Sequence, residues 1–171
     1  MKTTFAFVLL IAASLAAQEM SSPTQKQSAA SHRADVEQHG DHAMGFSHAR
    51  TTHHFLLYPD GGAIEATAND PADSESVQQM RTHLTHIAGM FADGNFSAPM
   101  FVHSQVPPGV PVMRKDRVYI TYTFKDLPAG ASVLIKSNNA EAIDAVHKFL
   151  QFQIDDHHTG DSGKIVSPSA Q

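Results

Sequence analysis

One pattern occurs twice along this chain and restricts the folds open to it. Two runs of β-type residues joined by a tight turn are followed by a helix with one apolar face, first over residues 51–94 and again over residues 116–154. Strands joined by tight turns pair antiparallel, and an amphipathic helix must bury its apolar face on another element. The sequence therefore predicts an α+β fold, a two-layer sandwich in which a four-stranded, mainly antiparallel sheet carries two helices and the ββα unit is repeated.

The first unit contains a hairpin and a helix. Residues 59–62, Pro-Asp-Gly-Gly, separate the two strands, and proline with glycine is typical of a tight turn. Asp70 is the predicted N-cap of the helix, with Pro71 at its first position and Gly94 after its end. The apolar residues between them recur at helical spacing: Val77, Met80, Leu84, Ile87 and Phe91.

The second unit repeats these signals. Strands at residues 116–124 and 132–136 flank a turn, and Asn138 is the predicted N-cap of the helix that follows. One face of that helix consists of Ile143, Val146, Leu150 and Ile154. The prolines of the segment between the units, residues 95–116, predict an extended crossover without regular helix.

The two ends of the chain are expected to lie outside the folded domain. Residues 1–17 contain a lysine, a short apolar run and then small residues, which is the layout of a secretory signal peptide. We expect residues 18–45 to form a flexible polar and histidine-rich lead, residues 46–160 a single α+β domain and residues 161–171 a flexible tail. The apolar run is too short to span a bilayer, so we expect an exported protein, periplasmic or extracellular, with no membrane attachment after cleavage.

The composition excludes some functions and favours one kind of ligand. The chain has no cysteine, so neither disulfides nor thiolate ligands are possible. Its formal net charge is −5 and it has no basic run, which argues against nucleic acid as a partner. Its 12 histidines are an unusually large number for 171 residues, and histidine is the commonest metal ligand.

Four segments cover nearly all of the predicted domain: "MGFSHARTTHHF", "HLTHIAGMF", "FSAPMFVHSQVPPGVPVM" and "VHKFLQFQIDDHHTGD". They resemble segments of a group of secreted bacterial proteins for which no activity is established. The resemblance implies an exported domain of this extent. It implies no cofactor, substrate or site.

The first predicted helix places three potential metal ligands together. At 100° per residue, His83, His86 and Met90 fall on one stripe beside its apolar face. Imidazole and thioether without thiolate suit copper, whereas imidazole alone also suits zinc, so copper is placed ahead of zinc. His103, in the proline-rich crossover, is a further candidate because a stiff backbone lowers the entropic cost of ordering a ligand. The alternative for each of these residues is an ordinary exposed or hydrogen-bonded side chain.

Four more histidines come from the first strand and the second helix. His53 and His54 are consecutive in a strand and point to opposite faces of the sheet, so the register decides which of them faces the helices. His147 and His157 lie on the second helix, whose end carries two aspartates that oppose the helix dipole unless another charge compensates them. The predicted metal ligands are therefore His83, His86, His103, His53, His54, His147, His157 and Met90.

These residues predict an exported protein that binds a transition metal ion and acts in binding, delivery or sensing, with no catalytic residue assigned. The histidine-rich residues 39–48 are expected to collect metal weakly. One alternative is a protein-interaction or dimerisation module with structural histidines, because Ala145, Phe149 and Phe152 form a second apolar stripe that the crossover or a second copy of the chain must cover. The other is a metal-dependent hydrolase or oxidoreductase, although the chain has none of the common enzyme motifs.

Overall fold

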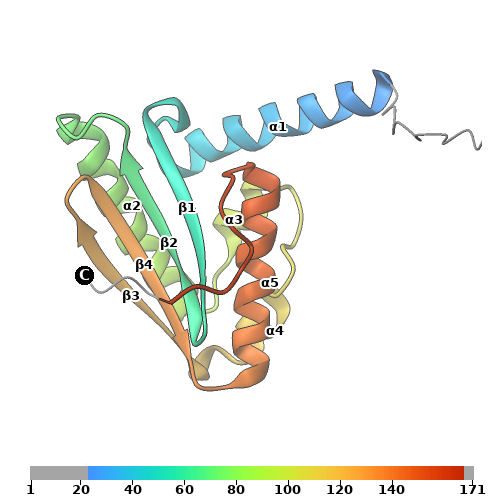
Figure 1. Ribbon diagram of the computed structural model, residues 1–171, viewed down its shortest axis with the longest axis vertical. Helices are drawn as coiled ribbons and strands as arrows, with labels where there is room; N and C mark the ends of the chain where they lie inside the picture. The colour runs from blue at the N-terminus through green and yellow to red at the C-terminus, as the bar shows by residue number, and fades with distance from the viewer. Residues whose placement is uncertain (1–22, 168–171) are drawn as a thin grey trace, which may run out of the picture.

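Two antiparallel hairpins share one sheet (Figure 1). The computed structural model describes residues 23–167. In it β1 (Thr51–Tyr58) pairs with β2 (Gly61–Ala68), and β3 (Ile120–Leu127) pairs with β4 (Gly130–Ser137). The inner strands β2 and β4 are also antiparallel, which gives the strand order β1-β2-β4-β3. The predicted α+β class with a four-stranded antiparallel sheet is confirmed.

A long helix follows each hairpin. α2 (Ser74–Ala92) packs on β4 and β3, and α5 (Ala140–His157) packs on β1 and β2 (Figure 1). Between them Phe91 and Phe149 meet edge to face with their ring centroids 5.9 Å apart, at the centre of the core. The buried apolar residues of these helices include most of those predicted from their spacing: Val77, Met80, Leu84, Ile87, Phe91, Val146, Leu150 and Ile154.

Further helical segments lie outside the two units, and the prediction of a crossover without helix is wrong. The additional elements are α1 (Pro23–Met44), η1 (His48–Arg50), α3 (Ser97–Val102), α4 (Val110–Lys115) and η2 (Arg117–Tyr119). Pro99 and Pro111 occupy the first turns of α3 and α4, where a helix does not need the missing N–H groups. η2 replaces the first residues of the strand predicted at 116–124, and the other four segments belong to neither unit, so the two-layer sandwich of repeated ββα units stays a prediction.

Both long helices begin later than predicted. The N-cap of α2 is Asp73, whose carboxylate accepts hydrogen bonds from the backbone N–H and the hydroxyl of Ser76 at 3.1 and 2.6 Å. The N-cap of α5 is Asn139, whose side chain accepts a bond from the third helical N–H. Asp70 and Asn138 were therefore wrong choices, because in each case a polar side chain nearer the helix makes the capping bond.

α1 stands where the flexible lead was expected. In Figure 1 its N-terminal part projects from the body of the molecule, while contacts with α3 and α5 hold the rest of it. Val36 on α1 and Phe46 just after it are 2% and 4% exposed. Helices gain most of their stability from tertiary packing, so α1 is stabilised by these contacts although it lacks an apolar period. No helix within residues 23–167 is long and apolar enough to cross a membrane.

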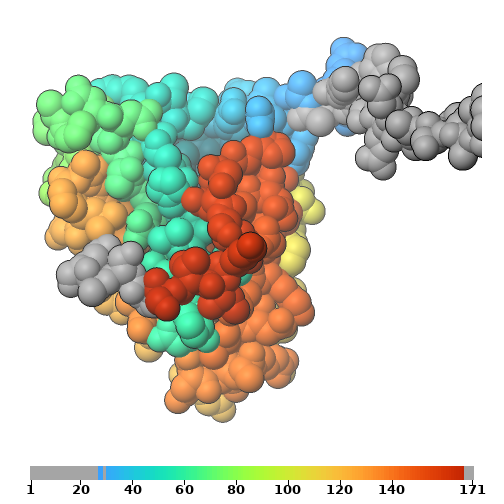
Figure 2. Space-filling model, viewed as in Figure 1, coloured from blue at the N-terminus to red at the C-terminus, as the bar shows by residue number. Residues whose placement is uncertain are grey.

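The C-terminal segment is also attached to the sheet, where a flexible tail was expected. The Val166 N–H donates to the Leu57 carbonyl at 2.9 Å, and Leu57 forms a parallel bridge with Ile165. Asp161 ties the start of the segment to β1 by accepting a bond from the Phe55 N–H at 2.9 Å. Figure 2 shows this segment, in dark red, lying across the surface of the molecule.

The segment between the units covers the second apolar stripe of α5. Phe149 packs against Phe96 with the ring centroids 6.0 Å apart, and both residues are fully buried. Gly109, at the start of α4, comes so close to α5 that an added Cβ would lie 2.0 Å from the Ala145 carbonyl oxygen. The sequence left two possibilities for what covers this stripe, the crossover or a second copy of the chain. At Ala145 and Phe149 it is the crossover.

Candidate functional site

Four histidines from different parts of the chain line one small cavity. His53 comes from β1, His83 from α2, His103 from the end of α3 and His157 from the end of α5. Most of the remaining wall consists of apolar core residues, and no aspartate, glutamate, lysine or arginine contributes to it. Its volume is about 80 Å³. Pockets for drug-sized ligands have volumes of roughly 300 to 1,000 Å³, so this one suits an ion or a molecule of a few atoms.

The register of β1 decides which of its two histidines reaches the cavity. Phe55 pairs with Ile64 on the side of the sheet that faces α5, and His53 shares that side because it lies two residues before Phe55. His54 points to the other side, where its Nδ1 lies 2.7 Å from the Asp161 carboxylate. His54 therefore fastens the C-terminal segment and is not at the cavity.

Aromatic neighbours hold three of the histidine rings. Phe46 stacks on His53 with the centroids 5.8 Å apart and meets His83 edge-on at 5.7 Å. His157 stacks on Phe55 at 5.7 Å. Unlike those of His103 and His147, the ring nitrogens of His53, His83 and His157 make no hydrogen bond with another described residue. The three rings are half-buried, and their nitrogens are not among the fully buried polar atoms without a partner in the described part of the chain, so solvent reaches them.

Burial keeps the same three imidazoles neutral at neutral pH. Desolvation, and then the neighbouring His83, lowers the pKa of His53 to about 4. Desolvation, and then His86, lowers the pKa of His83 to about 4. Desolvation, followed by repulsion from His103 and His53, lowers the pKa of His157 to about 3. Neutral imidazole is the form that coordinates a metal ion, so all three rings are in the competent state.

His103 differs from the other three because both of its ring nitrogens have partners. Its Nδ1 lies 2.6 Å from Asp156 Oδ2, and its Nε2 lies 2.9 Å from Gln153 Oε1. The ring is buried and meets His157 edge-on with the centroids 4.9 Å apart. We therefore place His103 beside the cavity as a support for Gln153 and His157, with no ring nitrogen left for a metal ion.

The aspartates at the end of α5 are compensated by side chains of the chain itself. Asp156 lies 2.9 Å from His32 of α1 as well as next to His103, and Asp155 accepts a bond from Gln151 at 3.0 Å. Burial alone would raise the pKa of the Asp156 carboxyl, but hydrogen bonds from His32 and His103 outweigh it and hold that pKa below its ordinary value. A bound cation is therefore not needed to explain Asp156.

Gln153 is a cavity residue that the sequence reasoning missed. It is 4% exposed, it lines the cavity, and its Nε2 is buried without a hydrogen-bond partner. A polar residue in the buried stripe of a helix is uncommon. Its spacing, three residues after Leu150 and four before His157, is the signal that could have identified it.

Met44 is the second residue that was missed. It lies at the end of α1 and lines the histidine cavity together with the two pockets beside it. The prediction assigned the thioether to Met90, which packs against the core and does not line the cavity. From the sequence, residues 39–48 with their methionine are expected to collect metal as a flexible arm, so Met44 is not predicted at an ordered site.

The remaining predicted ligands lie elsewhere. His86 is exposed on α2, so of the stripe His83, His86 and Met90 only His83 reaches the cavity. The stripe lies at the edge of the buried face of the helix, where His83 is half-buried and His86 is exposed. His147 donates from Nε2 to the Tyr58 carbonyl at 2.8 Å, which ties α5 to the turn after β1.

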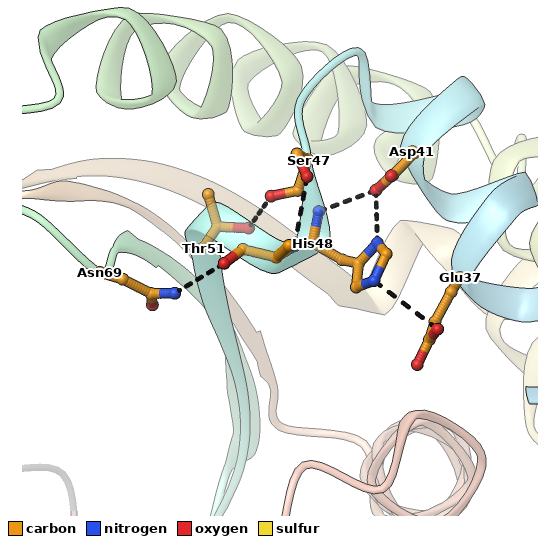
Figure 3. Close-up of polar contacts among 7 residues, drawn as sticks. Glu37, Asp41, Ser47, His48, Thr51 and Asn69 are labelled. Carbon is orange, nitrogen blue, oxygen red and sulfur yellow. Dashed lines mark hydrogen bonds and ion pairs between the residues drawn. The ribbon is translucent and has the colours of Figure 1, made fainter. Parts of the chain in front are cut away.

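A polar pocket of about 210 Å³ adjoins the cavity. His53 and His157 line both spaces and so form the wall between them. Glu37 and His48 lie on the other side of the pocket. Figure 3 shows how η1 is fixed to α1 there: His48 Nδ1 lies 2.9 Å from Asp41 Oδ1, and its Nε2 lies 3.6 Å from Glu37 Oε2.

Within residues 23–167 no three histidine, aspartate or glutamate side chains are already grouped closely enough to hold a metal ion. The rings of His53, His83 and His157 line one cavity, and they would have to turn toward a common point to share an ion. Comparisons with protein-family models, curated proteins and solved structures find no match to this chain.

Proposed function

We propose that this protein binds one transition metal ion through His53, His83 and His157 and acts in metal binding, delivery or sensing. The observation that supports this most is that three neutral imidazoles with free ring nitrogens line one cavity from three separate elements. One metal ion would be a partner for all three rings at once if they turned toward a common point.

Copper stays ahead of zinc in this proposal. Three imidazoles also suit zinc, but Met44 adds a thioether to the wall of the same cavity. A set of histidines with one methionine and no carboxylate is typical of copper sites, because the softer thioether favours copper over zinc. Met44 thus takes the part that the sequence analysis gave to Met90.

We expect one copper ion per chain in the full protein purified without a histidine tag, and loss of most of the affinity in His83→Asn. A ligand at a hundredfold excess over its Kd stabilises the folded state by about 2.7 kcal/mol, so copper should also raise the Tm by several degrees. Metal analysis after dialysis, calorimetric titration and thermal melting measure these quantities.

His86→Asn is the matched control. It removes an imidazole from the same helix, but from an exposed position outside the cavity. Equal copper affinity in wild type and in His83→Asn, or loss of affinity in His86→Asn, would show that the metal is bound outside the cavity.

Export remains part of the proposal. Residues 1–17, the expected signal peptide, lie outside the described residues. We expect the exported protein to begin near Ala17 or Gln18, because small residues suited to cleavage end there. Mass spectrometry of the protein recovered outside the cytoplasm tests this, and an intact Met1 on that protein would contradict it.

A further inference from the structure

β3 is an outer strand of the sheet, and its edge that faces away from β4 is open. Within residues 23–167, β3 pairs with β4 alone. It is eight residues long and contains no proline, so every residue keeps its backbone N–H group. In an antiparallel strand, every second residue directs its N–H and C=O groups away from the neighbouring strand. These groups can therefore form a ladder with a strand from another chain.

A groove lies beside this edge, between β3 and α2. Its volume is about 510 Å³, and it is lined by Gln78, Arg81, Thr82 and Thr85 of α2 and by Phe124 and Asp126 of β3. The two threonine hydroxyls already donate to carbonyls of their own helix, at 3.0 and 2.8 Å. Arg81 Nε lies 2.9 Å from Asp126 Oδ1, so the two charged residues of the groove neutralise each other. Protein interfaces are depleted of free charge at their centre, and this groove has that character.

The opposite edge of the sheet shows a position of this kind filled by an extended segment. β1 lies beside α5 as β3 lies beside α2. Residues 161–167 contact both β1 and α5: the Val166 N–H donates to the Leu57 carbonyl, and a Cβ added to Gly163 would lie 2.1 Å from Gln151 Oε1. No residue of the described range takes the corresponding place beside β3.

The sequence of β3 is complementary to itself. When two copies of β3 pair antiparallel about a twofold axis at Thr123, Tyr122 of each copy lies opposite Phe124 of the other. Aromatic cross-strand pairs stabilise a sheet, and both side chains are only partly buried in the single chain. Lys125 of each copy lies opposite Thr121 of the other, so these lysines do not face each other. An axis two residues further along would place the two lysines opposite each other.

Association through β3 would end at two copies. The sheet has two outer strands, β1 and β3. In the pair the two β3 edges cover each other, and residues 161–167 already occupy part of each β1 edge. A contact in which the same surface of both copies meets about a twofold axis is closed, so it does not continue into a filament. A second copy of this chain is therefore the occupant that fits the open edge.

We propose that two copies of this chain associate through β3, which joins their sheets into one and brings their α2 helices together. The exposed stripe that α2 contributes is uncharged and consists of Gln78, Thr82, Thr85 and Gly89. The inference is independent of the proposed metal site, because His53, His83 and His157 do not line this groove.

Sedimentation velocity over a concentration series tests this with the full protein, in EDTA so that no metal ion bridges histidines of different molecules. We expect a reversible dimer. Thr123→Lys, at an exposed position in the middle of β3, places two like charges on the axis and should weaken dimerisation by about tenfold or more. Thr52→Lys is the matched control, because it adds the same charge at an exposed threonine of the other outer strand, β1. It should leave dimerisation unchanged.

A charge exchange tests the alignment of the two strands. Thr123→Glu alone should also be monomeric, whereas a mixture of Thr123→Lys and Thr123→Glu should form a heterodimer, because opposite charges then meet on the axis. Circular dichroism establishes the fold of each variant, and if Thr123→Lys does not fold, Thr123→Glu is compared with Thr52→Glu instead.

A wild type that stays monomeric over the whole series, or a dimer that Thr123→Lys leaves intact, overturns the proposal. A mixture of the two folded variants that stays monomeric overturns the alignment at Thr123. Copper binding is measured separately, so none of these results bears on the proposed metal site.

Discussion

His53 and His54 show how much one residue of register decides. The strand sends adjacent side chains to opposite faces, so His53 lines the cavity, where desolvation lowers its pKa to about 4, while His54 pairs with Asp161. A shift of β1 by one residue would exchange these environments. The same residue type is thus a candidate metal ligand in one position and an anchor for the C-terminal segment in the next.

Gly109→Ala is expected to destabilise the protein by several kcal/mol. The added Cβ would lie 2.0 Å from the Ala145 carbonyl oxygen, and the φ of 84° is itself unfavourable for alanine. Gly45→Ala is the matched control, because Gly45 has a φ of 74° and nothing within 4 Å of an added Cβ. Gly45→Ala should lower the free energy of unfolding by about 1 to 2 kcal/mol, which is the cost of the positive φ without any steric clash. Urea unfolding measures both, and equal losses would contradict the close approach of α4 to α5.

The sequence identified some of the cavity residues for reasons that the structure explains. His53 and His157 were candidates from their positions in a strand and at a helix end, and both line the cavity. Gln153 and Met44 were missed, because glutamine is not an expected core residue and because Met44 lies in a stretch without an apolar period. Whether a histidine ring nitrogen has a hydrogen-bond partner depends on residues that are distant in the sequence, such as Asp156 for His103. The spacing of residues within one helix or strand does not reveal such partners.

At the scale of elements, α1 closes one side of the histidine cavity. Gly40, Ala43 and Met44 contribute to its wall, and the helix is held by contacts with α3 and α5. Its own sequence has no apolar stripe, so only the assembled fold shows this role. We infer that the N-terminal region belongs to the proposed site, whereas from the sequence its residues 39–48 are expected only to collect metal weakly.

Deleting residues 18–45 should therefore weaken copper binding by tenfold or more and lower the Tm. The deletion removes Met44 and exposes the cavity to water, which competes for the metal and for the imidazoles. Deleting residues 18–30 instead keeps His32 with its bond to Asp156, keeps the cavity wall, and should leave the copper affinity unchanged. Calorimetric titration compares the two, and full affinity in the longer deletion would exclude α1 from the site.

Element boundaries were predicted less well than the elements themselves. The four strands and two long helices follow from apolar periodicity, a signal repeated over many residues. The caps were misplaced because several polar residues near each helix start can make the capping bond, as Asp70 and Asp73 illustrate. α3 and α4 were missed because proline excludes the interior of a helix but not its first turn.

At the scale of the whole molecule, the metal-free protein should lose stability on mild acidification. The pKa values of His53 and His83 are about 4 and that of His157 about 3 in the folded state, against 6.5 in the unfolded chain. Between these values the unfolded chain binds more protons, so the free energy of unfolding is highest above pH 6.5 and falls as the pH drops toward 4. One pKa unit corresponds to about 1.4 kcal/mol, and because the three rings are only half-buried, screening by solvent makes the loss smaller than the sum of the three shifts.

Urea unfolding at a series of pH values from 7 to 4 measures this loss. His83→Asn removes one of the three groups and should flatten the curve, whereas His86→Asn, which is exposed, should leave its shape unchanged. A stability that stays constant over the whole series would mean that the three rings are not buried as neutral groups.

The C-terminal segment, residues 161–167, also affects whether copies of this protein associate with one another through the sheet. β1 is an outer strand of the sheet, and an outer strand with free N–H and C=O groups is a template for strands of other molecules. Residues 161–167 occupy part of that edge through the bond from the Val166 N–H to the Leu57 carbonyl. A protein truncated after residue 160 would expose this edge, so light scattering on concentrated samples should show aggregation that the full chain resists.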